Sequence, residues 1–170
     1  MAIIAVGCVT GVTAHAQPCG GMQDLGTLGR NNSGASGVSA DGGVVVGHEY
    51  NGAGYDSRAF RWTASGGMQN LAAPGRFSSS AAAVSADGSV VVGNTNTLPT
   101  GRMIAVRWTT SGGMQDLDGL DSGDSVAWGV SADGSVVVGQ RGSPRGSPFV
   151  AFRWRVLGGL QLGTLGGTTS

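Results

Sequence analysis

Apolar and polar residues alternate along short stretches of this chain, in the pattern typical of β-strands. In the stretch Arg58–Thr63, Phe60 and Trp62 fall on one face of a strand. Ala59 and Arg61 fall on the other face, which is the alternation expected of a strand with one buried side. No apolar spacing of three and four residues persists, so helices are not expected. Four strands are predicted near the start of the chain: Met22–Leu25, Ala35–Ser39, Val44–Glu49 and Arg58–Thr63.

The third of these strands opens with three consecutive valines, and the same triplet recurs at Val90 and Val136. An unbroken apolar run without alternation indicates a strand covered on both faces. Asp41-Gly42 lies between the second and third predicted strands. This dipeptide suits a tight hairpin turn, in which both central residues need a positive φ.

The strand pattern belongs to a repeat. The sequence Gly-Gly-Met-Gln-Asp/Asn-Leu opens at Gly20, Gly66 and Gly112, 46 residues apart, and a degenerate copy opens at Gly158. Ser-Ala-Asp-Gly and Arg-Trp recur with the same step. The units are residues 20–65, 66–111 and 112–157, with a partial unit at 158–170.

Four antiparallel strands in a repeat of 40 to 50 residues are typical of a propeller blade. The predicted fold class is therefore all-β, with tandem four-stranded antiparallel units forming a partial β-propeller; a β-solenoid is the alternative. Three complete units are fewer than the four with which propellers close. The chain is then a fragment, an open fan, or a protomer that completes a ring with a partner, and a fragment is favoured.

Strand alternation also predicts which loops share an end of the sheets. The loops after the first and third predicted strands of each unit emerge on the same side, and they differ between copies. The Asp-Gly turns on the opposite side are almost identical. Variation on one side of a constant scaffold is typical of binding surfaces, although unconstrained drift of loops explains it equally well.

Residues 1–16 differ in composition from the rest. A short apolar stretch precedes Ala14-His15-Ala16, as in a secretory signal peptide cleaved before Gln17, although no Lys or Arg precedes it. A buried first strand is the alternative. The mature chain, residues 17–170, is expected to form one β-repeat array with no transmembrane segment, because the apolar stretch is too short to cross a bilayer.

Charge and composition exclude several functions. The net charge is zero and the chain has ten arginines but no lysine, so no basic surface for nucleic acid is expected. Without lysine there is no Walker A loop. One histidine, His48, remains after the signal peptide, and no Gly-x-Ser-x-Gly motif occurs. The sequence therefore predicts no enzyme.

Two motifs carry a family resemblance. Arg58-Ala59-Phe60-Arg61-Trp62-Thr63, followed by Gly66-Gly67-Met68-Gln69, resembles the HAF family of bacterial extracellular repeats. The stretch Val84–Gly93 is also similar to that family. The histidine of the family's His-Ala-Phe triplet is absent here, where Arg58 stands in the first copy. The resemblance implies export, often within large surface or autotransporter passenger proteins, and it implies no catalytic chemistry.

Two sets of residues are candidate sites. Trp128 stands where the other copies have Ser36 and Ala82, and an indole can stack on a sugar ring, although filling the core is favoured. The candidate ligand-binding residues are Trp128, Tyr50 and Tyr55. The candidate metal ligands are Asp116, Asp118, Asp121 and Asp124. These could bind Ca²⁺, which takes six or more oxygens, but their spacing is not that of an EF-hand and a solvated loop is favoured. No other cofactor is expected.

These observations predict an exported structural or adhesive surface repeat module without catalysis. The alternative is a lectin-like, carbohydrate-binding propeller that uses the variable loops. The expected partners are a protein or glycan at the cell surface and either the remaining repeats of a longer chain or a second copy. The expected location is secreted or on the bacterial cell surface, at the outer membrane or outside the cell.

Overall fold

The computed structural model describes residues 21–52, 56–97, 100–117, 123–142, 149–156 and 160–161. These residues form twelve strands in three antiparallel sheets of four strands each and contain no helix. The described part of the chain thus lacks any helix that could span a membrane. The all-β prediction is confirmed, whereas the predicted signal peptide lies outside the described residues.

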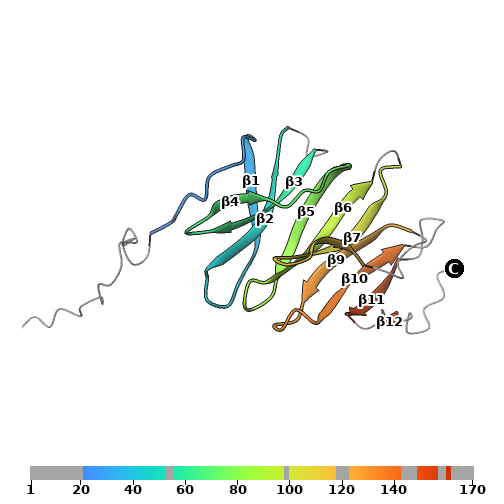
Figure 1. The fold of residues 1–170 in the computed structure, drawn as a ribbon. Helices are drawn as coiled ribbons and strands as arrows, with labels where there is room; N and C mark the ends of the chain where they lie inside the picture. Colours follow the sequence, from blue (N-terminus) through green and yellow to red (C-terminus); the bar gives the residue numbers. More distant parts are fainter. Residues whose placement is uncertain are drawn as a thin grey trace, which may run out of the picture.

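Each sheet is an up-and-down meander whose strands follow one another in the chain (Figure 1). The first sheet contains β1 (Asn32–Val38), β2 (Val44–Tyr50), β3 (Ser57–Thr63) and β4 (Gly67–Asn70). The second contains β5 (Arg76–Val84), β6 (Val90–Thr97), β7 (Met103–Thr109) and β8 (Gly113–Asp116). The third contains β9 (Ser125–Val130), β10 (Val136–Gly142), β11 (Phe149–Arg155) and β12 (Leu160–Gln161).

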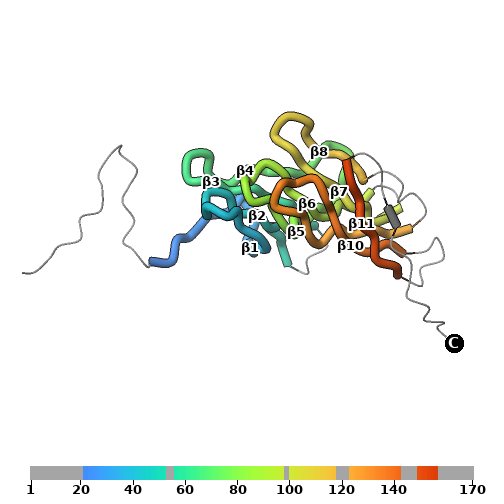
Figure 2. Tube along the Cα trace, turned by 90° about the horizontal axis from the view of Figure 1, so that it is seen from below, coloured from blue at the N-terminus to red at the C-terminus, as the bar shows by residue number. Residues whose placement is uncertain are grey.

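The sheets lie side by side in sequence order, as Figures 1 and 2 show from two directions. The first strands of successive sheets are in contact, β1 with β5 and β5 with β9, so the sheets converge on this edge. No sheet closes on itself. Three four-stranded leaves that fan out from one edge form a partial β-propeller, as predicted.

The strand that contains the Gly-Met-Gln motif is the last of each sheet, whereas the sequence analysis placed it first. In register, β4 pairs Gln69 with Arg61, and β8 pairs Gln115 with Arg107. Each sheet therefore takes three strands from one repeat and its fourth from the start of the next. Met22–Leu25, predicted as a strand, is in none. It lies at the start of the described chain, where no earlier sheet supplies a neighbour to pair with.

The core lies between the sheets. Val44, Val46 and Ala59 of the first sheet pack against Val91 and Trp108 of the second. The second sheet packs in the same way on the third through its own core cluster: Val90, Val92, Ala105, Ala127, Val137 and Phe152.

The second sheet is covered on both sides, so all three of its valines Val90–Val92 are buried, as the triplet predicts. The same prediction is wrong for the first and third sheets, where Val45 is half-buried and Val138 is exposed, because each has a sheet on one side only. The prediction that β3 has only one buried side is wrong. Ala59 is as buried as Phe60, because the next sheet covers the face that Ala59 occupies.

A β-bulge recurs in the first strand of every sheet. The register shifts between Ala35 and Gly37, and again at the equivalent places in β5 and β9. The residues at the bulge are Ser36, Ala82 and Trp128. Opposite each bulge is the glycine that follows the valine triplet. A Cβ at Gly47 would overlap the carbonyl oxygen of Gly34, and one at Gly93 would overlap that of Ser80. The invariant glycine therefore lets the two backbones approach at the bulge.

The Asp-Gly connection is longer than the predicted two-residue turn. β1 ends at Val38 and β2 begins at Val44. Gly42 N–H donates to the Ser39 carbonyl over 3.0 Å, and Gly42 itself has a φ of 73°. The glycine is thus the left-handed residue that follows the turn, in the arrangement of longer hairpin loops.

Candidate functional site

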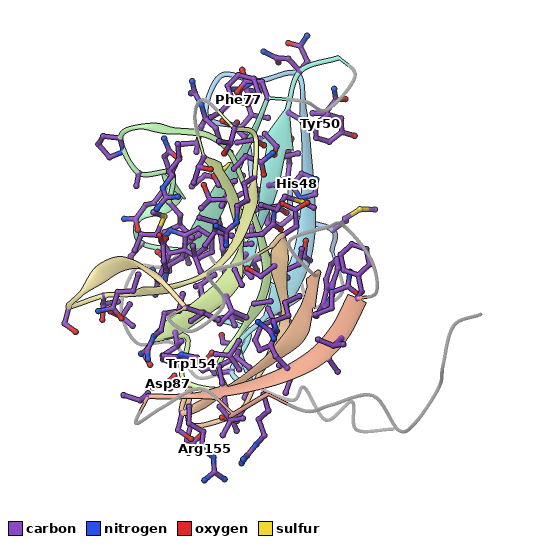
Figure 3. The ribbon with its side chains drawn as sticks, turned by 90° about the vertical axis from the view of Figure 1, so that its right-hand side faces the viewer. His48, Tyr50, Phe77, Asp87, Trp154 and Arg155 are labelled. Carbon is purple, nitrogen blue, oxygen red and sulfur yellow. The ribbon has the colours of Figure 1, made fainter. Side chains whose placement is uncertain are left out.

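The two ends of the sheets differ in character. We name as the loop rim the end that carries the β2–β3, β6–β7 and β10–β11 loops and the links between sheets. The turn rim is the opposite end, with the Asp-Gly turns. In Figure 3, Phe77 and Tyr50 lie at the loop rim, while Asp87 and Arg155 lie at the turn rim. The strand order confirms the prediction that the variable loops share one end.

The carboxylates at the turn rim accept hydrogen bonds from residues of their own turns. Asp87 accepts hydrogen bonds from the Ser85 hydroxyl at 2.6 Å and from the Ser89 N–H at 3.0 Å. These bonds, the Ser85 hydroxyl first, lower the pKa of Asp87 to about 2. Asp41 and Asp133 make the same contacts, and their pKa values are lowered for the same reason.

At the loop rim of the first sheet, a buried ion pair fastens the N-terminal segment. Glu49 has no exposed surface, and one of its oxygens accepts the N–H of Leu28 at 2.8 Å. Arg30, 6% exposed, lies 3.7 Å from the other oxygen and 2.8 Å from Asp56. The Arg30–Glu49 contact is an ion pair without a hydrogen bond. This network holds residues 28–31 against the sheet.

In the second sheet Arg76, the repeat equivalent of Arg30, forms a more exposed ion pair with a carboxylate at a different position, Asp116. Both carboxylate oxygens of Asp116 lie within hydrogen-bond distance of Arg76, at 2.7 and 2.9 Å. Asp124 accepts the N–H of Met103 at 3.0 Å. Asp118 and Asp121 lie outside the described residues. Among the residues with described positions, no group of three or more acidic, His or Cys side chains could hold a metal. The calcium site stays a prediction.

Aromatic side chains gather at the loop rim. Tyr50 ends β2, and its ring centroid lies 5.7 Å from that of His48. Phe77 and Phe149, at the starts of β5 and β11, are 49% and 53% exposed. The sequence analysis missed these two phenylalanines. Each stands where the other copies have a different residue, so the contrast between copies that singled out Trp128 could have found them. Tyr55 lies outside the described residues.

Trp128 is 57% exposed, so the interpretation of this residue as part of the core is wrong. The bulge in β9 gives the physical reason. Between Ala127 and Gly129 the register shifts, and the residue in the shift is left unpaired with β10. Trp128 therefore does not fill the space between sheets. It lies on the converging edge of the fan rather than at the loop rim.

His48 is the described residue best suited to proton transfer. Its Nδ1 lies 3.3 Å from the hydroxyl of Ser80 on the neighbouring sheet. A Ser-His pair needs a carboxylate on the other ring nitrogen to act as a triad. Within the described residues, no carboxylate bonds to His48, and Glu49 points to the opposite face of β2. The contact joins two sheets.

Arg107, which precedes the repeated Trp108, contacts an aromatic ring on the next sheet. The guanidinium of Arg107 lies 5.5 Å from the ring centroid of Trp154 on the next sheet. The Trp108 indole N–H donates to the Leu71 carbonyl at 2.8 Å. A groove of about 560 Å³ runs beside these residues, with the Arg76–Asp116 pair on its wall.

No protein-family model matches the sequence, and no match was found among curated proteins. Several solved structures share its fold, including the following two. TolB from Acinetobacter baumannii superposes with a TM-score of 0.55 at 15% identity, over 76% of this chain and 31% of that protein. A protein assigned as TolB from Agrobacterium tumefaciens gives 0.55 at 16% identity, over 79% of this chain and 50% of that one. The chain thus spans a third to a half of these β-propeller proteins, and the likeness concerns the fold alone.

Proposed function

We propose that this chain is a non-catalytic module of an exported bacterial protein, structural or adhesive in role, that contacts a protein or glycan through its loop rim. The propeller fold is compatible with a binding or structural role. The export and the cell-surface location rest on the predicted signal peptide at residues 1–16 and on the resemblance to HAF repeats.

The contrast between the two rims is the observation that carries this proposal. At the turn rim the same aspartate in each repeat is bonded within its own turn, and the turn sequence is almost the same in every copy. At the loop rim the equivalent positions differ between repeats and expose Phe77 and Phe149. Exposed aromatic rings supply much of the contact energy in protein interfaces.

Binding of intact bacterial cells or of a purified outer-membrane fraction tests the adhesive role. The mature chain, residues 17–170, is expected to bind in a saturable way, and Phe77→Ser should weaken binding at least tenfold. The control is Val156→Ser, because Val156 is similarly exposed, at 55%, but lies next to the turn rim. Equal losses in the rim variant and the control would reject the loop rim as the contact surface.

A lectin-like role is the second candidate, and the exposure of Trp128 favours it. An indole with 57% of its surface exposed can stack on a sugar ring. A glycan array separates the two candidates. The lectin role predicts a signal that Trp128→Ala or Tyr50→Ala abolishes, whereas silence across a broad array leaves the structural or adhesive role.

A further inference from the structure

The third sheet presents an apolar face on which no other sheet of the described residues packs. In the first two sheets the equivalent face packs on the next sheet, and Val46 and Val92 are completely buried there. At the same position in the third sheet, Val138 is 44% exposed. Ala151, the counterpart of the buried Ala59 and Ala105, is also exposed. The chain already forms this sheet-on-sheet interface twice. The uncovered face of the third sheet is the one that, in the first two sheets, packs on the following sheet.

The first sheet exposes the complementary face, which in the second and third sheets packs on the preceding sheet. Ala81 and Ala127, on the faces that receive a preceding sheet, are completely buried, whereas their counterpart Ala35 is exposed. A hollow of about 490 Å³ opens at this face of the first sheet. Its walls are the segment Met22–Leu25 on one side and residues that include Ala35 and Phe60 on the other.

The segment Met22–Leu25 has the sequence of an outer strand but no sheet to join. Its counterparts β4 and β8 pair with the strand of the preceding sheet that bears the Arg-Trp motif. In the third sheet the same edge of β11 holds only β12, a strand of two residues. β12 pairs Leu160 with Arg153, one residue out of the register that β4 and β8 keep, in which Gln161 would face Arg153. A one-residue slip reverses the faces of a strand, so β12 does not reproduce the outer strand of the other sheets.

Backbone groups at the turn rim point to the same contact. Ala40 N–H donates to the Ala86 carbonyl, and Ala86 N–H donates to that of Ala132, both at 3.0 Å. Within the described residues Ala132 N–H makes no bond of this kind, nor does the Ala40 carbonyl accept one. The ladder therefore has a free donor at its third turn and a free acceptor at its first.

We propose that the open face of the third sheet binds the first sheet of a second copy of this chain. Met22–Leu25 of the second copy then becomes the outer strand beside β11, with its Gln23 opposite Arg153. The contact joins two different surfaces, so it either closes into a ring or extends. Two copies hold six sheets, which lies within the four to eight blades of closed propellers. A two-chain ring is the expected assembly.

The mass of the mature chain in solution, measured by light scattering and sedimentation over a range of concentrations, tests the proposal. The expected mass is that of two chains, and Val138→Asp should reduce it to one. Val156→Asp is the matched control, because Val156 lies on the groove beside Trp154, on the other face of the same sheet. Larger species that Val138→Asp abolishes would support the same contact without ring closure. A wild-type monomer at about 100 μM, or a dimer that survives Val138→Asp, would overturn the proposal.

A disulfide cross-link tests the register. In a Cys19→Ser background, Gln23→Cys together with Arg153→Cys should form a dimer linked between chains under mild oxidation, because directly opposed residues of antiparallel strands are close enough to bridge. Moving the second cysteine to the first sheet, as Arg61→Cys, should abolish the link, since β4 already occupies that edge. Equal cross-linking in both pairs would reject the proposed strand addition.

Discussion

Ala40 and Ala86 occupy the same place in consecutive repeats, and the N–H of the first donates a 3.0 Å hydrogen bond to the carbonyl of the second. Ala86 and Ala132 are joined in the same way. These bonds link backbone groups, so the turns of successive repeats are joined directly by their main chains. The turn beside them must keep its glycine: a Cβ at Gly88 would overlap the side chain of Val44 in the preceding repeat.

The glycine opposite each bulge is predicted to be indispensable for stability. Gly93→Ala should lower the free energy of unfolding by about 2–3 kcal/mol, because the new Cβ meets the fixed carbonyl of Ser80. Gly34→Ala is the control, since a Cβ there meets nothing within 4 Å. Urea unfolding followed by tryptophan fluorescence measures both. The explanation fails if the two variants are equally stable.

The indole nitrogen of Trp108 is predicted to stabilise the contact between the first two sheets. Trp108→Phe keeps an aromatic ring in the core but removes the 2.8 Å bond to the Leu71 carbonyl. A loss of about 1–2 kcal/mol is expected, because the carbonyl is left without that partner. Trp128→Phe, at an exposed position, should change the stability by less than about 0.5 kcal/mol. Chemical denaturation of the two variants provides the comparison, and similar losses would argue against this role.

Two repeat-equivalent arginines are predicted to differ in importance. Arg30→Ala leaves the fully buried Glu49 without its cation and should cost about 3 kcal/mol. Arg76→Ala removes an ion pair whose carboxylate is 41% exposed, and it should cost at most about 1 kcal/mol. Thermal unfolding at neutral pH ranks the two variants. A larger loss from Arg76→Ala would contradict the assignment of Glu49 and Arg30 as the fastening of the N-terminal segment.

The turn aspartates predict a particular dependence on pH. The pKa of Asp87 is lowered from 3.8 to about 2 in the folded chain. A lowered pKa means that the ionised carboxylate favours the folded state above pH 3.8, and this contribution disappears as the pH falls to about 2. In Ser85→Ala the pKa of Asp87 should rise toward 3.8, while that of Asp133 stays at about 2. NMR titration of the carboxyl carbons measures both pKa values. An unchanged pKa of Asp87 in this variant would show that the Ser85 hydroxyl is not the main cause of its lowering.

Local sequence was sufficient to predict most of the strands, although Met22–Leu25 forms none, but it did not predict all of their burial. The period of two in Arg58–Thr63 and the valine triplets gave the strands, and the 46-residue repeat gave four of them per unit. The same pattern misjudged Ala59, because a small residue on a second face looks exposed until another sheet covers it. Trp128 was expected in the core because it is large and apolar, but it is exposed. It lies in a β-bulge, and the bulge arises from the pairing of β9 with β10, which the local sequence does not reveal.

The candidate site was predictable only in part. The alternating direction of the strands placed the variable loops at one rim. In an antiparallel meander, every second loop lies at the same end of the sheet. The partners of Asp116 and Glu49 were not predictable. Arg30 lies in the segment before β1 and Arg76 is the first residue of β5, and both are far in sequence from the carboxylates with which they pair.

By itself, the sequence determined that this chain is a set of β-leaves with a constant turn rim and a variable loop rim, because side-chain alternation and turn glycines act over a few residues. The tertiary structure alone decided which sheet each Gly-Met-Gln strand joins and which faces remain uncovered. The physical reason is that a strand edge needs backbone hydrogen-bond partners and an apolar sheet face needs a packing partner. Both partners come from other parts of the structure. Val46 and Val138 have the same local sequence, yet the first is buried and the second is open, because only the first has another sheet against it.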